Sequence, residues 1–466
     1  MALEMPRGET AISMGGKSFS NAIFTDLYEL TMAQAYWQNG MIARARFSLF
    51  FRQYPPNRAY FVAGGLEDVL DYLQDFRFAD DDLTYLRSTG QFQDEFLDSL
   101  KKLRFTGNVR AMQEGTIFFA SEPVLEVEGP MIEVQLIETF LINQVNLQTI
   151  LATKASRVLH AAKGKTVVDF AARRTHGTEA ANRMARSSYI AGFAGTSNVM
   201  AGGLYDIPTV GTMAHSFITA FENETEAFRA YARSFPDTST FLVDTYDTLE
   251  GTRNAARVGL EMREQGHELR AIRLDSGDML DLSQKARGIL DEAGLSNVQI
   301  FASGGLDEFE VEQLLSAKAA IDGFGVGTKA GVSADAPWTD CAYKLVEYDG
   351  RPTLKLSTDK QTLPGVKQVF RYRDPDAIFS HDVIASEGEL QPPNSESLLQ
   401  TVMTSGAKTA EHPTLPELRQ SFAREFALLP YKHKAIEAPA NFDVRISNML
   451  AKLQADVAAG IRRHTS

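Results

Sequence analysis

Cysteine and long apolar runs are nearly absent from this sequence. Cys341 is its one cysteine in 466 residues, which rules out an intrachain disulfide framework and suits a reducing compartment. No uninterrupted apolar run approaches the roughly 18 residues of a membrane-spanning helix, and residues 1–20 lack the apolar core of a signal peptide. We therefore expect a cytoplasmic protein with no membrane partner.

Positive charge is also in short supply. The chain has 47 lysines and arginines against 60 aspartates and glutamates, a formal net charge of −13. This balance argues against a nucleic-acid coat and against a polybasic membrane contact, so no nucleic-acid partner is expected. It is compatible with a local cationic pocket that binds an anionic substrate.

The remaining composition is that of an ordinary globular enzyme, with 44% hydrophobic and 23% charged residues. The length predicts two or three structural units. Residues 21–39 show helical spacing, 105–135 predict short strands separated by glycine and proline, and 136–163 predict one long helix.

From Thr166 onward the sequence repeats a strand, a polar or glycine-containing turn and a helix. This rhythm is typical of parallel strands with crossover helices, in an open sheet or a barrel. Six candidates are too few for a regular eight-stranded barrel, so a barrel would be irregular. The expected strands are 167–170, 207–210, 241–244, 269–274, 298–302 and 321–326.

The stretch from Asp206 to Ser216 combines the elements of a site in this kind of fold. The apolar run 207–210 ends at Gly211, and a helical pattern begins near Ser216. A strand that ends in a glycine turn and restarts as a helix places His215 at the carboxyl edge of the sheet, where parallel α/β folds carry their chemistry. The structural alternative is a histidine that caps a helix or fills a core gap.

Two other strand ends carry charged side chains. Arg173 and Arg174 follow the first strand, and their guanidinium forks suit phosphate or carboxylate, although they also suit a solvated surface. The strand containing Arg273 ends in Asp275 and Asp278 around a Ser-Gly turn. That arrangement is suited to holding Mg²⁺ or sugar hydroxyls, or to capping the next helix with an aspartate.

The last two strands each end in a glycine-containing turn, where backbone N–H groups can converge on a phosphate. The sequence has no Walker A motif, no complete dinucleotide fingerprint and no Cys/His cluster for zinc. Together the strand ends predict an anion-binding α/β enzyme with a phosphorylated sugar as substrate. The turn residues are Ser303, Gly304, Gly305, Gly327 and Thr328.

In a set of ordered motifs the sequence resembles nicotinate phosphoribosyltransferase, over a span from about residue 25 to about residue 369. The resemblance implies an irregular TIM-like α/β barrel at residues 141–345 and a mixed α/β N-terminal domain at 1–140. It also implies that the segment 346–466 packs back on the N-terminal domain and completes it. The motifs are Thr25–Met32, Asp169–Arg174, Gly195–Val199, Gly211–Ser216, Arg273–Asp278 and Gly325–Thr328.

The resemblance further implies a reaction. Members transfer ribose 5-phosphate from phosphoribosyl pyrophosphate to nicotinate, giving nicotinate mononucleotide in NAD biosynthesis. They couple this ligase-type transfer to ATP hydrolysis, use Mg²⁺ or Mn²⁺, and work as homodimers with shared active sites. His215 matches the histidine that ATP phosphorylates in the family, and a neutral imidazole nitrogen is nucleophilic enough to accept that phosphoryl group.

The resemblance assigns nicotinate to one set of residues. Tyr28, donated by the partner subunit, and Phe170 would stack on the two faces of the pyridine ring. Thr212 and Arg273 would contact nicotinate, and the arginine is the natural partner of its carboxylate.

Phosphate and metal are assigned to a second set. Arg173 would help to hold phosphate, and Asp275 would face the ribose or the metal-bound pyrophosphate. Asp275 and Asp278 are the candidate metal ligands. The 5-phosphate would lie in the two glycine-containing turns, that is, on Ser303, Gly304, Gly305, Gly327 and Thr328.

Three alternatives accompany this assignment. Nicotinamide phosphoribosyltransferases place an aspartate where Ser197 stands here, so Ser197 favours the acid over the amide. Quinolinate phosphoribosyltransferase has a much shorter chain and lacks the His215 motif. A non-catalytic ligand-binding relative would be free to lose the polar strand ends, which this sequence keeps.

Overall fold

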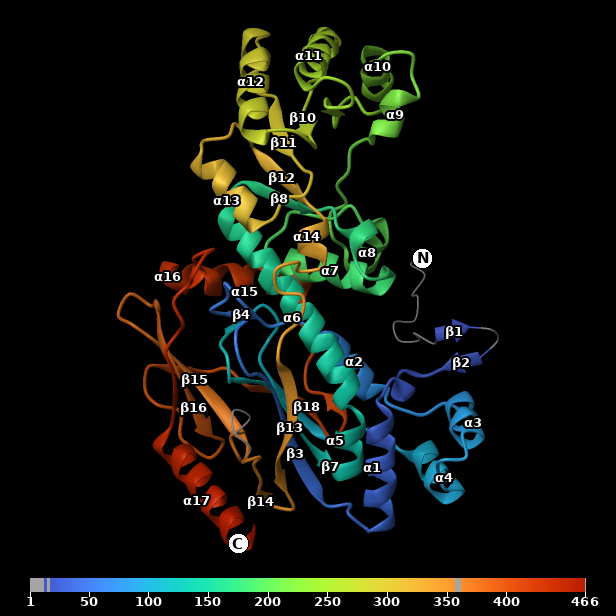
Figure 1. The fold of residues 1–466 in the computed structure, drawn as a ribbon, viewed down its shortest axis with the longest axis vertical. Coiled ribbons are helices and arrows are strands. Elements are labelled where there is room, and N and C mark those ends of the chain that lie inside the picture. The colour runs from blue at the N-terminus through green and yellow to red at the C-terminus, as the bar shows by residue number, and fades with distance from the viewer. Residues whose placement is uncertain (1–11, 15–16, 357–361, 466) are drawn as a thin grey trace. The chain divides into compact units, whose positions relative to one another are not determined.

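A computed structural model describes residues 12–14, 17–356 and 362–465 of the chain (Figure 1). The chain folds into two compact units. Unit 1 consists of residues 1–149, 338–433 and 439–466, and unit 2 of residues 150–337 and 434–438. The resemblance implies domain boundaries at 140/141 and 345/346, and those boundaries stay a prediction.

Five parallel strands form the centre of unit 2, in the order β8-β12-β11-β10-β9. They coincide with five of the six expected strands, because short apolar runs between turns are buried on both faces of a helix-covered parallel sheet. Their bounds are β8 (Thr166–Asp169), β9 (Thr240–Leu242), β10 (Ala271–Leu274), β11 (Gln299–Ala302) and β12 (Gly323–Val326).

The sixth expected strand, 207–210, is wrong as a strand. Only Thr209 pairs, through an isolated parallel bridge to Thr196, which in turn bridges to Asp169 at the end of β8. Pro208 has no N–H to donate, and its carbonyl accepts the N–H of Thr196. The parallel series therefore runs from Thr209 to β9, and the pairings among the described residues leave it open at these two ends.

Helices connect the strands of unit 2, as the alternating pattern predicts. The long α6 (Glu138–Ala161) is shorter than the expected helix 136–163, because a separate α5 (Met131–Leu136) precedes it. The others are η2 (Ala172–Arg174), α7 (Thr178–Ile190), α8 (Val199–Tyr205), α9 (His215–Thr219), α10 (Glu224–Ser234), α11 (Thr248–Glu264), α12 (Met279–Glu292), α13 (Glu308–Ser316) and α14 (Thr328–Gly331).

Unit 1 contains a seven-stranded sheet in the order β14-β13-β3-β7-β5-β18-β19. Chain segments from both ends of the sequence build it, since β13 pairs with β3 and β18 pairs with β5. Its strands are β3 (Arg44–Phe51), β5 (Asn108–Ala111), β7 (Pro123–Pro130), β13 (Cys341–Tyr348), β14 (Arg351–Pro352), β18 (Gln400–Thr404) and β19 (Ala407–Lys408).

A four-stranded sheet and two short strand pairs complete the β structure of unit 1. The four-stranded sheet has the order β17-β15-β16-β20. Its strands are β15 (Lys367–Arg373), β16 (Phe379–Ser386), β17 (Ser395–Ser397) and β20 (Val444–Ile446). The pairs are β1 (Ile12–Met14) with β2 (Lys17–Phe19), and β4 (Phe61–Val62) with β6 (Ile117–Phe118).

The helix expected over residues 21–39 is two elements in the structure, η1 (Asn21–Ile23) and α1 (Leu27–Gln38). Asp26 occupies the N-cap position of α1. Among the described residues, no helix is long and apolar enough to cross a membrane. The helices not yet named are α2 (Leu66–Gln74), α3 (Asp80–Ser88), α4 (Asp94–Lys102), α15 (Leu415–Leu428), α16 (Tyr431–Lys434) and α17 (Asn448–Thr465).

Candidate active site

Arg273 is the centre of a hydrogen-bond network at the carboxyl edge of the parallel sheet. It lies on β10, and its guanidinium donates to three different segments of unit 2. Nε donates to Ser303 Oγ at 2.8 Å, Nη1 to Thr212 Oγ1 at 3.0 Å, and Nη2 to Asp275 Oδ1 at 2.8 Å. One side chain thus joins the ends of β10 and β11 to the loop that precedes α9.

Asp275 receives hydrogen bonds on its carboxylate from two of these groups. Ser303 Oγ donates to its Oδ1 at 2.5 Å, in addition to Arg273. Burial raises the pKa of Asp275, but the hydrogen bonds from Ser303 and Arg273 outweigh burial, so the pKa lies below its usual value. Asp275 is therefore a carboxylate at neutral pH, which is the state that can bind a metal or a sugar hydroxyl.

His215 lies at the edge of this network, as the sequence predicts. It is the first residue of α9, and its Nε2 lies 4.0 Å from Asp275 Oδ2. Its Nδ1 is 3.1 Å from Thr245 Oγ1. The side chain is 45% exposed, so the imidazole is open to a reactant from solvent rather than enclosed in a core.

Phe170 follows β8 and lies beside the guanidinium. The Cζ atom of Arg273 is 5.4 Å from the centre of the phenyl ring, a cation–π distance. A Cβ atom on Gly325 would lie 2.5 Å from this ring, so only glycine leaves room for the phenyl group at that position of β12. The aromatic ring and the guanidinium therefore lie against each other at the carboxyl edge of the sheet, although β12 and β11 separate β8 from β10.

The two predicted phosphate turns lie at the ends of β11 and β12. Gly304 has a φ of +93°, and a Cβ atom on it would lie 1.9 Å from the carbonyl oxygen of Asp275. Glycine is required there both for the left-handed backbone and for the close approach. Ser303 is buried, Gly327 precedes the short helix α14, and Thr328 is exposed at its start.

Three further predicted site residues of unit 2 also make no hydrogen bond or ion pair with Arg273. Arg173 lies in η2 and is exposed, with no side-chain hydrogen bond or ion pair to another described residue. The backbone N–H of Ser197 donates to the carbonyl of Asp169 at 2.8 Å. Asp278 caps α12, since its Oδ1 accepts the N–H groups of Leu280 and Asp281.

Tyr28 belongs to unit 1, where it lies in the first turn of α1. Its side chain is about half exposed. Burial and the neighbouring Glu29 carboxyl raise its pKa well above the usual value for tyrosine.

Two residues of the network were missed by sequence reasoning. Asp244 follows β9, and its Oδ2 accepts both the backbone N–H of Asp275 and the hydroxyl of Ser276. Thr245 is the partner of His215 Nδ1. Both directly follow the apolar run 241–243, so their place at a strand end was the signal that could have identified them.

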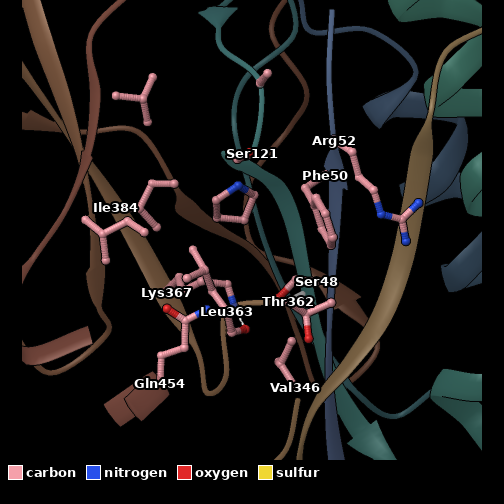
Figure 2. Close-up of a pocket in the computed structure, with 14 residues that line it drawn as sticks. Ser48, Phe50, Arg52, Ser121, Val346, Thr362, Leu363, Lys367, Ile384 and Gln454 are labelled. Atoms are coloured by element: carbon pink, nitrogen blue, oxygen red, sulfur yellow. Dashed lines mark hydrogen bonds between the residues drawn. The ribbon is translucent and has the colours of Figure 1, made fainter. Parts of the chain in front are cut away.

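A cavity of about 410 Å³ lies in unit 1, lined by residues of β3, β13, β15 and β16 among others (Figure 2). Two cations line it, and both are already paired. Arg52 Nη1 donates to Asp340 at 2.6 Å, and Lys367 Nζ lies 3.2 Å from Glu126 Oε1. None of the predicted site residues lines this cavity.

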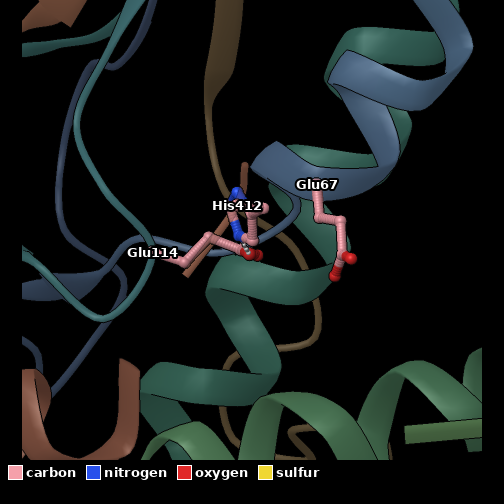
Figure 3. Close-up of side chains that lie close together, drawn as sticks. All are labelled: Glu67, Glu114 and His412. Atoms are coloured by element: carbon pink, nitrogen blue, oxygen red, sulfur yellow. Dashed lines mark hydrogen bonds and ion pairs between the residues drawn. The ribbon is translucent and has the colours of Figure 1, made fainter. Parts of the chain in front are cut away.

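Glu67, Glu114 and His412 form the one group of three potential metal ligands found among the described residues (Figure 3). Glu114 is buried, and both of its carboxylate oxygens already accept hydrogen bonds. The backbone N–H of Gly65 donates to Oε1 at 2.7 Å, and His412 Nε2 lies 2.7 Å from Oε2. We interpret the group as an ion pair that joins distant segments of unit 1.

Family models match three successive stretches of the chain, which together span most of its length. The N-terminal domain model of nicotinate phosphoribosyltransferase matches residues 23–146, the model of the family itself matches 166–358, and the C-terminal domain model matches 387–454. The chain belongs to the nicotinate phosphoribosyltransferase family. The second of these matches contains every residue of the Arg273 network.

Relatives of this family are similar over nearly the whole chain. Nicotinate phosphoribosyltransferase pncB2 of Mycobacterium tuberculosis is 49% identical over 444 residues, which are 94% of this chain and 95% of that protein. The nicotinate phosphoribosyltransferase of Bacillus subtilis is 38% identical over 94% of this chain and 95% of its own. Both alignments are long enough to include both units.

Solved structures share the fold. The crystal structure of human nicotinic acid phosphoribosyltransferase has a TM-score of 0.84 at 29% identity, and the match covers 93% of this chain and 99% of the human one. A nicotinate-nucleotide pyrophosphorylase from Pyrococcus furiosus has a TM-score of 0.72 at 27% identity, covering 88% of this chain and 96% of that one. The chain therefore has the mixed α/β fold of these enzymes, with the parallel sheet described above.

Proposed function

We propose that the chain transfers ribose 5-phosphate from phosphoribosyl pyrophosphate to nicotinate, which releases pyrophosphate and forms nicotinate mononucleotide. The Arg273 network carries this proposal. It combines a fixed guanidinium, an aromatic ring, a carboxylate and two glycine turns at one edge of a parallel sheet, which are the groups that a pyridine carboxylate and a phosphorylated sugar require.

Arg273 and Phe170 would bind nicotinate. Nη2 of Arg273 gives one of its two hydrogens to Asp275, so the other is left for the substrate carboxylate. The hydroxyl of Thr212 accepts from Nη1 at 3.0 Å and donates to the carbonyl of Met213 at 3.3 Å, and it would turn to donate to that carboxylate when nicotinate binds. The phenyl ring of Phe170 would support the face of the pyridine ring.

The two glycine turns and Arg173 would bind the phosphates of the sugar substrate. Backbone N–H groups at Gly304, Gly305 and Gly327 lie beyond the ends of β11 and β12, where the sheet no longer uses them. Arg173 is exposed and has its donors available, so it suits the 5-phosphate or the pyrophosphate.

The residues present fit a divalent metal that arrives with the pyrophosphate. Asp244 Oδ1 is buried and has no hydrogen-bond partner among the described residues, and the adjacent Asp275 is ionised. Mg²⁺ or Mn²⁺ is commonly held by one or two carboxylates together with substrate phosphates, and Asp244 and Asp275 would hold it here. Such a metal neutralises the charge that develops on the leaving pyrophosphate. Asp278 is less suited, since it caps α12.

The reaction needs positioning more than proton transfer. The pyridine nitrogen attacks C1 of the ribose with its own lone pair, while the bond from C1 to the pyrophosphate oxygen breaks. Arg273 and Phe170 would hold the ring, and the glycine turns would hold the sugar, so that nitrogen and C1 meet in line. Asp275 would stabilise the positive charge that the ribose gains in the transition state.

His215 would accept the γ-phosphoryl group of ATP. If its Nδ1–H donates to Thr245 Oγ1, the lone pair lies on Nε2, on the side of Asp275. Nε2 then attacks the γ-phosphorus and ADP leaves. Water later cleaves the P–N bond of the phosphohistidine and releases phosphate, and the two steps together couple ATP hydrolysis to synthesis. The added negative charge beside Asp275 and Arg273 would change how tightly the site holds its anionic substrates.

The proposal extends to the architecture and the assembly. The parallel series from Thr209 to β9 would close as an irregular barrel, and the hydrogen bond from Arg273 of β10 to Thr212 already connects the strand next to β9 with the loop after Thr209. The exposed Tyr28 would complete the nicotinate pocket of a second subunit in a homodimer. An enzyme that consumes phosphoribosyl pyrophosphate and ATP would work in the cytoplasm.

Pyrophosphate release tests the proposal. The purified protein is incubated with phosphoribosyl pyrophosphate and Mg²⁺, with and without ATP, and with nicotinate, nicotinamide, quinolinate or no acceptor. We expect release with nicotinate that ATP stimulates, and little release with the other three. Release that favours nicotinamide or quinolinate would assign a different acceptor, and no release with any acceptor would contradict catalysis.

A further inference from the structure

A group of charged side chains with a fully buried centre lies beside the residues that follow the two glycine turns of unit 2. We call it the Lys154 cluster, and it consists of Lys154, Arg157, Asp307, Glu308, Glu310, Lys329 and Asp335. Lys154 lies on α6, and its side chain is 0% exposed. A lysine ammonium is costly to bury and is retained only where several partners compensate it.

Lys154 contacts the residues that follow both turns. Its Nζ lies 2.5 Å from Glu308 Oε2 and 3.7 Å from Asp307 Oδ2, at the start of α13. It also donates to Asp335 Oδ1 at 2.7 Å, just beyond α14. One ammonium group on α6 therefore joins the segment after turn 303–305 to the segment after turn 327–328.

Lys329 makes a second connection between the same segments. It is the residue after Thr328, and its Nζ lies 2.5 Å from Glu310 Oε1 on α13 and 3.8 Å from Asp307 Oδ2. Asp307 in turn caps α13 by accepting the N–H of Phe309 at 3.0 Å. Backbone hydrogen bonds hold β11 and β12 together. Beyond the ends of these strands, ion pairs connect the two segments instead.

We propose that Lys154 and Asp335 are positioning residues that fix the distance between the two glycine turns, and thereby set the affinity of the site for the 5-phosphate end of the sugar substrate. The inference rests on the proposed function, because it assigns that phosphate to these turns. Converging backbone donors hold an anion tightly only when both loops are fixed before it binds. Neither side chain belongs to the substrate-contacting residues named above.

Asp335→Asn is the principal test, because its side chain is partly exposed and the variant keeps its shape. We expect the KM for phosphoribosyl pyrophosphate to rise about tenfold or more, with the KM for nicotinate unchanged within about twofold. Ribose 5-phosphate, which has only the 5-phosphate, should lose inhibitory potency by a similar factor. Inorganic pyrophosphate should keep its potency, because it occupies the other end of the substrate site.

Lys154 provides the second test. Lys154→Met should show the same selective loss, and Lys154→Arg should recover most of the wild-type KM because it keeps the charge. Glu261→Gln is the matched control, since it removes another partly exposed ion pair of unit 2, between α11 and Arg229 of α10, away from the turns. This control should leave unchanged the KM for phosphoribosyl pyrophosphate, the KM for nicotinate, and the inhibition constants of ribose 5-phosphate and pyrophosphate.

The inference is overturned if Asp335→Asn leaves ribose 5-phosphate inhibition unchanged, or if it raises the KM values of both substrates together. Its failure is separable from failure of the proposed function. If the wild type forms no nicotinate mononucleotide, calorimetric titration of ribose 5-phosphate into the wild type and Asp335→Asn still compares their affinities. Equal affinities would then contradict the role of the cluster.

Discussion

Two arginines in this protein make similar contacts in different surroundings. In unit 1, Arg371 of β15 pairs with Asp382 and Glu425 and lies 4.3 Å from the ring centre of Phe379. In unit 2, Arg273 pairs with Asp275 and lies 5.4 Å from the ring centre of Phe170. Arg371 and Asp382 are 0% exposed, whereas Arg273 and Asp275 are 12% and 29% exposed.

The difference in exposure separates a structural ion pair from a proposed binding site. Arg371 and Asp382 are fully buried and Glu425 is 18% exposed, so the charge of Arg371 is closed off from any ligand. Arg273 keeps an open flank, next to a half-exposed histidine and two glycine turns. The same residue chemistry therefore stabilises unit 1 in one place and is available for substrate in unit 2.

The largest effect is expected from Arg273→Ala. The substitution removes one charge-assisted hydrogen bond to the nicotinate carboxylate and one to Asp275, each worth about 1.5–3 kcal/mol, so kcat/KM for nicotinate should fall by roughly 10²–10⁴. The melting temperature should change little, because the site is at an open edge. Steady-state kinetics measure kcat/KM, and thermal unfolding measures the melting temperature. A large loss of stability with normal kinetics would make Arg273 the same kind of residue as Arg371.

Arg371→Met should give the opposite pattern. It leaves the buried carboxylate of Asp382 without its partner, which costs about 3–5 kcal/mol of unfolding free energy. Activity per folded molecule should stay close to that of the wild type. Urea unfolding, with activity measured well below the transition midpoint, tests this. A variant as stable as the wild type would show that the buried pair contributes no net stability.

His215→Ala separates coupling from synthesis within the open site. We expect it to abolish ATP hydrolysis and the stimulation by ATP, while slow ATP-independent synthesis of nicotinate mononucleotide survives. Wild type incubated with γ-labelled ATP should acquire an acid-labile, base-stable label, as a phosphoramidate does. Unchanged ATP stimulation in the variant, or a label on another residue, would contradict the assignment.

Ser197→Asp sharpens the account of substrate choice. A second anion near the pyridine substituent should repel nicotinate and accept the amide N–H of nicotinamide. We expect kcat/KM for nicotinate to fall by about 1.5–3 kcal/mol, roughly 10- to 100-fold. The ratio of the two substrates' kcat/KM values measures this. An unchanged ratio would place Ser197 outside the pocket.

The last prediction concerns the pH dependence of stability and a buried acid without a guanidinium. Glu29 of α1 is as buried as Asp382 but accepts its hydrogen bond from the Gln135 amide at 2.6 Å. Burial raises the pKa of Glu29 from 4.5 to about 7. The folded state therefore binds the proton of Glu29 more tightly than the unfolded chain does. The stability that this protonated carboxyl contributes below pH 4.5 is lost as the pH rises to 7.

Glu29→Gln should remove this dependence. Because the pKa rises from 4.5 to about 7, the unfolding free energy of the variant should decline by roughly 3 kcal/mol less than that of the wild type between pH 4.5 and 8. Urea unfolding at several pH values measures the slope of unfolding free energy against pH for the wild type and for the variant. Identical slopes would show that Glu29 titrates normally in the folded protein.

Part of this architecture can be predicted from the sequence because it is local. An apolar run followed by glycine or charge marks a strand end, and this placed Arg273, Asp275 and Ser303 at one edge of the sheet. The run 207–210 has the same composition, yet Pro208 prevents a regular strand. Asp244 lies at an equivalent position and was passed over, because a single aspartate after a short run gives no distinctive pattern.

Contacts between distant segments could not be predicted. Nothing near Lys154 in the sequence shows that it lies against Glu308 and Asp335, and nothing near Arg371 shows that Asp382 and Glu425 enclose it. Whether a charged residue is sealed or open depends on which elements pack over it. That information lies in the fold, and it is what distinguishes Arg273 from Arg371.

Calorimetric titration of nicotinate into the wild type, Arg273→Ala and Arg371→Met, each in the presence of pyrophosphate and Mg²⁺, tests the central claim most directly. The claim is that the open arginine of unit 2, and not the sealed one of unit 1, binds the substrate carboxylate. We predict that Arg273→Ala loses nicotinate binding and that folded Arg371→Met keeps the wild-type affinity. Unchanged binding by Arg273→Ala would contradict the account.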